Sequence, residues 1–163
     1  MTISPFVCLS GTASRYTDLR GHLDVLYEHD NVVLKRSFSR AGVFRGMHWQ
    51  KPPHVQTKLI RVISGRIIDF VVAPESAERV LHHRELGPED GWLQICAHLA
   101  HGFYALRDTE FEYLCHGAYN AQAEQSYSIA DFIAEHLGIR EVIYSDKDAA
   151  APRLHAIPRN IPI

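Results

Sequence analysis

Cysteine is scarce in this sequence of 163 residues: there are three, Cys8, Cys96 and Cys115, and no CxxC pair. An odd number of widely spaced cysteines argues against a disulfide framework and for reduced thiols, so we expect a cytoplasmic protein. No apolar run reaches the 18 residues of a membrane-spanning helix, and no leader with a charged and then an apolar region opens the chain. The sequence therefore predicts no membrane association and no export.

An excess of charge of one sign is also absent. Charged residues make up 22% of the chain and the formal net charge is −2. A basic excess that would favour nucleic acid is missing, and so is a block of like charges that would indicate a disordered tail. The sequence thus predicts no nucleic-acid partner, and its length fits one domain, residues 1–163, with a sizeable core.

Short strand-like runs dominate what is present. They are separated by turn residues about every ten positions, which is typical of an all-β sandwich or closed barrel. Two tight pairs are expected, 57–64 with 67–72 and 101–106 with 110–116. The predicted strands are 23–27, 32–38, 43–50, 57–64, 67–72, 80–86, 92–96, 101–106 and 110–116.

Helical spacing occurs in one place, residues 129–137, which read IADFIAEHL and are followed by Gly138. The tail from Pro152 to Ile163 is expected to be extended or wrapped over the body. We therefore predict an all-β domain with a short helical segment near its C-terminal end.

The densest set of reactive side chains lies between Gly42 and Val62. Arg45, His48 and Lys58 stand on two strand-like runs joined by a Pro-Pro turn, so a closing hairpin would bring them together. They would supply an anion clamp, a base that titrates near neutral pH and a fixed cation. Strict alternation puts Arg45 and His48 on opposite faces of a strand. We therefore expect a bulge at the intervening glycine to turn the histidine inward.

Taken alone, each of these residues also fits a purely structural role. A single strand histidine is more often structural, and Lys58 fits equally well as a surface lysine with inward-facing neighbours. Tyr113 in the run FEYLC fits a core tyrosine, and Asp148 in SDKD fits a solvated loop. A metal-dependent cupin needs histidines at H-x-H spacing; His98 and His101 do not provide it.

Several segments closely resemble the dTDP-4-dehydrorhamnose 3,5-epimerases, which are cupin-like sugar-nucleotide enzymes. Residues 45–62 match RGLHxQ…KLxRV, and 100–103 (AHGF) match the end of F-A-H-G-F. Residues 18–21 (DLRG) match D-x-R-G, and 145–152 (SDKDAAAP) match S-x-K-D-x-x-x-P. The resemblance covers roughly 16–154 and implies a cupin-like jelly roll, a homodimer, a nucleotide-diphosphate sugar as substrate, and neither cofactor nor metal.

The resemblance also implies individual roles. His48 would remove a proton, Asp148 would orient it, Lys58 would stabilise the enolate oxygen, and Tyr113 would return a proton from the opposite face. The implied substrate-binding residues are Arg20, Arg45, His101, Lys147, Glu124 and Lys35, the last standing where the family has an asparagine.

The nucleotide pocket departs from the family pattern. Val33 and Lys35 replace the Q-x-N pair, Val25 stands at a glutamate position, and Ala118 precedes Tyr119 where the family has two tyrosines. Such exchanges should alter ligand choice strongly, because buried polar groups discriminate better than apolar ones.

The expected function is inversion of C3, C5 or both in a nucleotide-diphospho-4-keto-6-deoxysugar, with an enolate as intermediate. Three alternatives remain open at this point. A 3,4-ketoisomerase on the same scaffold would use similar enediol chemistry. A metal-dependent cupin enzyme would need a ligand set, and a non-catalytic sugar-nucleotide-binding module would have no use for His48, Tyr113 and Asp148 together.

Overall fold

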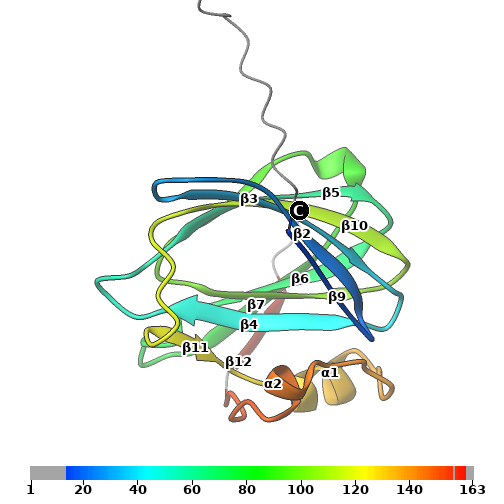
Figure 1. Ribbon diagram of the computed structural model, residues 1–163. Helices are drawn as coiled ribbons and strands as arrows, with labels where there is room; N and C mark the ends of the chain where they lie inside the picture. The colour runs from blue at the N-terminus through cyan, green and yellow to red at the C-terminus, as the bar shows by residue number, and fades with distance from the viewer. Residues whose placement is uncertain (1–13, 156, 161–163) are drawn as a thin grey trace, which may run out of the picture.

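Two six-stranded sheets face each other in the computed structural model, which describes residues 14–155 and 157–160. Figure 1 shows these two layers from the side. The first sheet has the order β1-β2-β3-β10-β5-β8, and all its neighbours are antiparallel. Its strands are β1 (Ser14–Asp18), β2 (Gly21–His29), β3 (Val32–Ser39), β5 (Thr57–Ser64), β8 (Leu93–Ile95) and β10 (Thr109–His116).

The second sheet has the order β11-β4-β9-β6-β7-β12. It is antiparallel except at its edge, where β12 runs parallel to β7. The described residues also form three short helices: η1 (Pro88–Asp90), α1 (Ala130–His136) and α2 (Asp146–Ala149). The strands of this sheet are β4 (Phe44–Gln50), β6 (Ile67–Val72), β7 (Val80–Leu86), β9 (Ala100–Ala105), β11 (Glu124–Ser126) and β12 (Ile157–Asn160).

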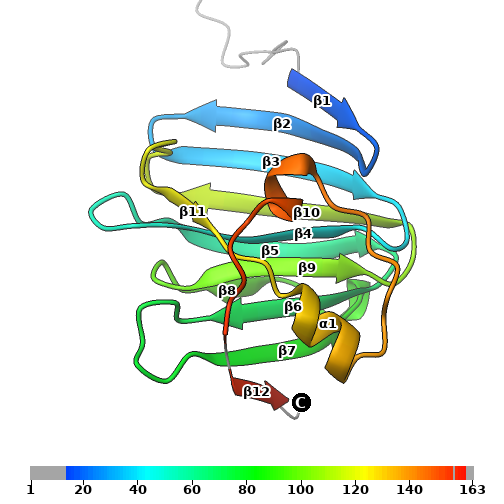
Figure 2. The same cartoon turned by 90° about the horizontal axis from the view of Figure 1, so that it is seen from below.

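Alternation along the strands divides the apolar side chains between two cores. One core lies on the outer side of the second sheet, where Phe70 and Tyr104 pack against Phe132 and Ile133 of α1. Figure 2 shows α1 lying across that sheet. The other core fills one part of the space between the sheets. It consists of Ile60, Val62, Ile67, Leu86, Ile95, Phe103 and Phe111.

The predicted all-β, cupin-like class is confirmed. Each predicted strand is present with small shifts of its ends, and the predicted helix is α1. The strands β1, β11 and β12 and the helix α2 were not predicted. In the described part of the tail, β12 pairs with β7, so this segment does run along the body. Among the described residues, no helix is long and apolar enough to cross a membrane.

The predicted hairpins are wrong. The two strands of each expected pair, β5 with β6 and β9 with β10, belong to different sheets, and so do β4 and β5. Consecutive strands can bury their apolar faces by facing each other across a sandwich as well as by pairing, and Ile60 of β5 and Ile67 of β6 share the core between the sheets in this way. Gly65 lies where the chain passes from β5 in the first sheet to β6 in the second. Its φ is +89°, and an added Cβ would lie 2.3 Å from the carbonyl oxygen of Asp108.

The predicted bulge in β4 is confirmed. The register between β4 and β9 shifts between Arg45 and His48. Gly46 has φ +124° there, and a Cβ on it would lie 2.4 Å from the Cα of Gly102. Only glycine fits this close approach. As a result Met47 packs in the core on the outer side of the second sheet, while Arg45 and His48 both line the space between the sheets.

Candidate active site

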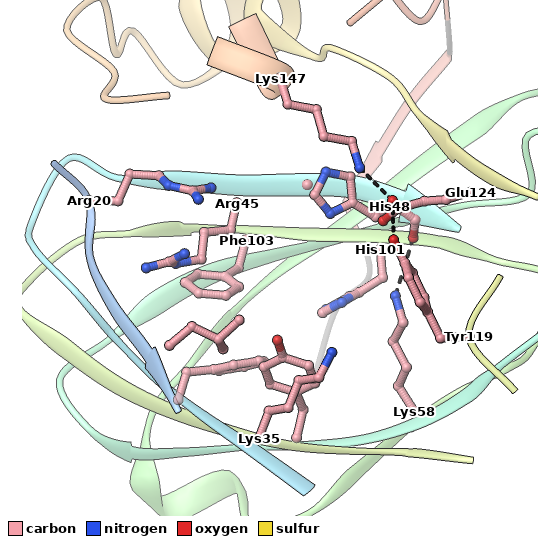
Figure 3. Close-up of a pocket in the computed structure, with 14 residues that line it drawn as sticks. Arg20, Lys35, Arg45, His48, Lys58, His101, Phe103, Tyr119, Glu124 and Lys147 are labelled. Atoms are coloured by element: carbon pink, nitrogen blue, oxygen red, sulfur yellow. Dashed lines mark hydrogen bonds and ion pairs between the residues drawn. The ribbon is translucent and has the colours of Figure 1, made fainter. Parts of the chain in front are cut away.

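A cavity of about 300 Å³ opens between the two sheets beside the inner core. Nine of the ten predicted site residues line it, and the tenth, Asp148, lies behind His48. The second sheet contributes His48 and His101, and the first contributes Lys58 and Tyr113. Figure 3 shows side chains from both layers pointing toward one another across this space. Bringing Arg45, His48 and Lys58 together therefore requires facing sheets, not a hairpin.

His48 is held by a buried carboxylate. Its Nε2 lies 2.7 Å from Oδ1 of Asp148, whose side chain is only 1% exposed. The other oxygen, Oδ2, accepts a hydrogen bond of 3.2 Å from Nη1 of Arg20. Burial by itself would raise the pKa of the Asp148 carboxyl, but the hydrogen bond to His48 and the charge of Arg20 outweigh it and hold that pKa below its usual value. The pair is thus an imidazole beside an ionised acceptor.

The short helix α2 positions Asp148. Ser145 precedes the helix in extended conformation, and its hydroxyl accepts a hydrogen bond of 3.1 Å from the backbone N–H of Asp148. Such a side-chain cap satisfies an otherwise unpaired donor at a helix start. The segment SDKD is therefore a capped turn whose one buried residue faces β4, and not the solvated loop that its polarity alone favours.

Tyr113 and Lys58 approach the cavity from the first sheet. In the part of the chain that the structure describes, the hydroxyl of Tyr113 has no hydrogen-bond partner, and burial raises its pKa well above the usual value. Nζ of Lys58 donates a hydrogen bond of 3.2 Å to the backbone oxygen of His48. Burial lowers the pKa of the Lys58 ammonium. Burial therefore favours the neutral form of both groups.

Arg45 offers a guanidinium without a carboxylate partner. Its Nε donates to the hydroxyl of Ser39 over 2.8 Å, and its Nη2 donates to the backbone oxygen of Phe38 over 3.2 Å. Burial and the nearby charge of Arg20 lower its pKa. These neutral partners orient the planar group and leave its charge available to an anion.

Glu124 and Lys147 occupy the rim of the cavity and pair with each other. Nζ of Lys147 lies 2.5 Å from Oε2 of Glu124, which also accepts a hydrogen bond of 3.0 Å from the hydroxyl of Tyr119 (Figure 3). The structure thus places both predicted residues at the site, already joined in one network.

Asp69 is the functional candidate that the sequence reasoning missed. Its carboxylate is 2.6 Å from Nε2 of His101, and both side chains are buried. The signal was present in the run IIDFVV, because a charged residue inside an apolar strand requires a partner. Two histidine–aspartate pairs therefore adjoin the cavity: His48 of β4 pairs with Asp148 of α2, and His101 of β9 pairs with Asp69 of β6.

Among residues 14–155 and 157–160, no three His, Cys, Asp or Glu side chains gather in an arrangement that could hold a metal ion. The reactive groups of the cavity are instead an imidazole, a phenol and several cations. Proton transfer next to a carbonyl, with an oxyanion stabilised by a cation, is the chemistry that such a set can perform.

Comparisons with known proteins agree with this arrangement. The family model described as dTDP-4-dehydrorhamnose 3,5-epimerase matches residues 12–156. A dTDP-4-dehydrorhamnose 3,5-epimerase of Mycolicibacterium smegmatis is 31% identical over 88% of this chain and 71% of its own length. The crystal structure of such an epimerase from Sulfolobus tokodaii matches 85% of each chain with a TM-score of 0.66 and 34% identity.

A third match carries a bound sugar nucleotide. It is the dTDP-6-deoxy-D-glucose-3,5-epimerase of Legionella pneumophila in complex with dTDP-4-keto-L-rhamnose, with a TM-score of 0.63 and 27% identity over 88% of this chain and 92% of that one. The fold and the cavity define the class of cupin-like isomerases that act on sugar nucleotides. Within that class, this chain belongs to the dTDP-4-dehydrorhamnose 3,5-epimerase family.

Proposed function

We propose that this protein inverts C3, C5 or both in a nucleotide-diphospho-4-keto-6-deoxysugar by moving protons through an enolate. The observation that carries the proposal is the position of two proton-transfer groups. The His48–Asp148 pair lies on one wall of the cavity, and the hydroxyl of Tyr113 lies on the facing sheet. A planar enolate bound between them could lose a proton to one side and gain one from the other.

His48 serves as the base. Because the ionised Asp148 can only accept, Nε2 of the neutral imidazole carries the hydrogen, and Nδ1 keeps the lone pair that takes a proton. The proton that it removes is acidified by the neighbouring C4 ketone. As the imidazolium forms, the carboxylate stabilises its charge, as a buried aspartate does for the histidine of hydrolytic triads.

Lys58 and Tyr113 complete the reaction. The negative charge that develops on the ketone oxygen is stabilised by the ammonium of Lys58, which works best in a site with little water. The hydroxyl of Tyr113 then gives its proton to the carbon from the opposite side, so that the centre is inverted. The ketone re-forms without any net oxidation or reduction.

Arg20, Arg45 and Lys147 bind the diphosphate in this proposal. Arg45 has no carboxylate partner, and Arg20 lies beside it on the cavity wall (Figure 3). Arginine recognises phosphate through parallel N–H···O bonds. Glu124 and His101 would contact the sugar or the nucleoside from the rim and the floor of the cavity.

The test is incubation of the protein in deuterated water with a panel of 4-keto sugar nucleotides, followed by analysis of position and configuration of the label. Deuterium at the inverted carbon next to the ketone supports the proposal. A product in which the carbonyl has moved to C3 would instead identify a 3,4-ketoisomerase. A panel that is bound but shows neither exchange nor product would identify a binding module.

Replacement of Asp148 by asparagine should lower turnover about 10–100-fold. The amide can still reach His48, but it neither fixes the reactive tautomer nor stabilises the imidazolium. Initial rates of epimer formation at several pH values measure the effect. Asp146→Asn makes the same chemical change on the exposed side of α2 and should keep the wild-type rate. Equal rates for Asp148→Asn and the wild type would remove the aspartate from the mechanism.

We propose further that the enzyme is a cytoplasmic homodimer. The cytoplasm fits the free thiols of Cys96 and Cys115. The dimer rests on the outer face of the first sheet; α1 covers the second sheet instead, and α2 lies against β4. Opposed residues on β2, β3, β10 and β5 form an apolar row across this face. The row consists of Tyr27, Leu34, Leu114 and Leu59, and Leu59 is 37% exposed.

A row of alternating charge lies next to the apolar row. Arg15 pairs with Asp24, and Glu112 pairs with both Arg36 and Arg61 at 2.9 and 2.6 Å. Opposite charges that alternate along one row can meet a second copy in antiparallel orientation without like-charge contacts, as a two-fold interface requires. The occupant of this face is therefore a second copy of the chain.

Light scattering during gel filtration should give the mass of two chains for the wild type at micromolar concentration. Leu59→Asp buries a charge in the proposed interface and should give the mass of one chain. The control is Ala134→Asp, on the exposed side of α1, which should remain dimeric. A wild-type mass of one chain would contradict the dimer.

A further inference from the structure

Lys35 is a cation on the inner face of the first sheet. It shares this face of β3 with Val33 and Ser37, which are buried. Its neighbours in register are Val25 on β2 and Tyr113 on β10. Opposed residues on adjacent antiparallel strands point to the same face of a sheet. The ammonium therefore faces the cavity beside the phenol and an apolar side chain.

Lys35 has no ion-pair partner among the described residues, whereas Arg20 pairs with Asp18 and Lys147 pairs with Glu124. Its nearest recorded contact is the ring of Tyr113, whose centroid lies 5.9 Å from Nζ. Figure 3 shows the Lys35 side chain rising into the cavity. A lysine in partly apolar surroundings without a counter-ion is costly unless a negative charge forms nearby during function.

Such a charge forms on Tyr113 in the proposed reaction. When the hydroxyl gives up its proton, the electron pair of the O–H bond stays on Oη as a phenolate. The electron pair of the enolate forms the new C–H bond, and the C4 carbonyl re-forms. Before the next turnover, water restores the proton on Oη, and the proton taken up by His48 neutralises the hydroxide that remains. Burial disfavours the phenolate, so its formation needs compensation from a nearby cation.

We propose that Lys35 is a positioning residue that stabilises the phenolate left on Tyr113 as the proton is transferred to the sugar carbon. The inference rests on the proposed epimerase function and deepens it. An ammonium close to an aromatic ring is attracted to the ring face and more strongly to a phenolate. In the family pattern this position is an asparagine, which has no charge. Lys35 thus gives this chain a charged support for the acid of the reaction.

Other charged groups also face Tyr113 and must be separated from Lys35 in a test. Lys58 acts on the enolate, which is common to deuterium exchange and to inversion. The ratio of inversion to exchange therefore isolates the step in which Tyr113 loses its proton. The titratable or charged groups around the phenol are Lys35 on β3, Lys58 on β5, Arg45 and His48 on β4, His101 on β9, Cys115 on β10, and Arg20 before β2.

The experiment compares Lys35→Met and Lys35→Arg with the wild type in deuterated water, using a dTDP-4-keto-6-deoxyhexose as the probe. Exchange with retention and formation of the epimer are measured separately. Lys35→Met keeps the apolar stem and should lower the inversion-to-exchange ratio about tenfold. Lys35→Arg should restore most of the ratio because the charge is kept. Lys51→Met, on an exposed loop, is the matched control and should leave both rates unchanged.

A Lys35→Met protein with an unchanged ratio, or with only a raised KM for both processes, would overturn the inference. Absence of exchange and inversion in the wild type with every sugar nucleotide of the panel would instead overturn the proposed function.

Discussion

His48→Asn should abolish both deuterium exchange next to the ketone and formation of the epimer. The side chain keeps a polar group near Asp148 but loses the nitrogen that takes the proton, and loss of a general base typically costs about 10²–10⁴-fold. Both processes begin with the same proton removal, so both should fall by the same factor. Proton exchange followed by NMR and epimer formation followed by chromatography provide the two rates.

The control for this variant is His155→Asn, because His155 is exposed and lies away from the cavity. It should match the wild type in both rates. If the His48→Asn protein is folded and still exchanges deuterium at the wild-type rate, another group is the base, and the histidine–aspartate pair has a structural role.

Tyr113→Phe should separate the two processes that His48→Asn removes together. The ring keeps its packing against Phe111 and its place beside the cavity, and only the acidic hydroxyl is lost. His48 can still remove a proton and return a deuteron to the same side, so exchange with retention should continue. Inversion should fall about 10²–10⁴-fold because no acid remains on the opposite face.

Tyr16→Phe is the matched control, since the hydroxyl of Tyr16 lies on an exposed strand outside the cavity. It should leave exchange and inversion unchanged. If inversion is unchanged in the Tyr113→Phe protein, Tyr113 is only a structural residue of the cavity wall. Equal and complete loss of exchange in folded Tyr113→Phe and His48→Asn proteins would contradict the assignment of one group to each face of the sugar.

Part of the site could be predicted from local signals, and the remaining residues were named by the family resemblance. The alternation of β4 and the glycine at position 46 together indicated a bulge, and the structure has it between Arg45 and His48. Because the neighbours of Lys58 are apolar, the sequence allowed either an inward cation or a surface lysine. The structure places the Lys58 side chain in the cavity. Here the short-range pattern and the tertiary structure agree.

Other features depend on contacts that local patterns do not contain. A strand with one apolar face has the same residue pattern whether the next strand in the sequence lies beside it in one sheet or opposite it in the other sheet. The prediction that β5 and β6 form a hairpin was wrong for this reason. Asp148 is brought to His48 from 100 positions away in the sequence by a four-residue helix, and no spacing rule could select it. The partner of His101 was missed because Asp69 was read only as part of its strand.

The most direct measurement is a single turnover of the wild-type protein in deuterated water with a dTDP-4-keto-6-deoxyhexose, analysed by NMR and mass spectrometry. Removal of a proton by His48 and return of a solvent-derived one by Tyr113 predict one deuterium at every inverted carbon next to the ketone. An inverted product that keeps the original hydrogen at that carbon would contradict proton transfer through the enolate.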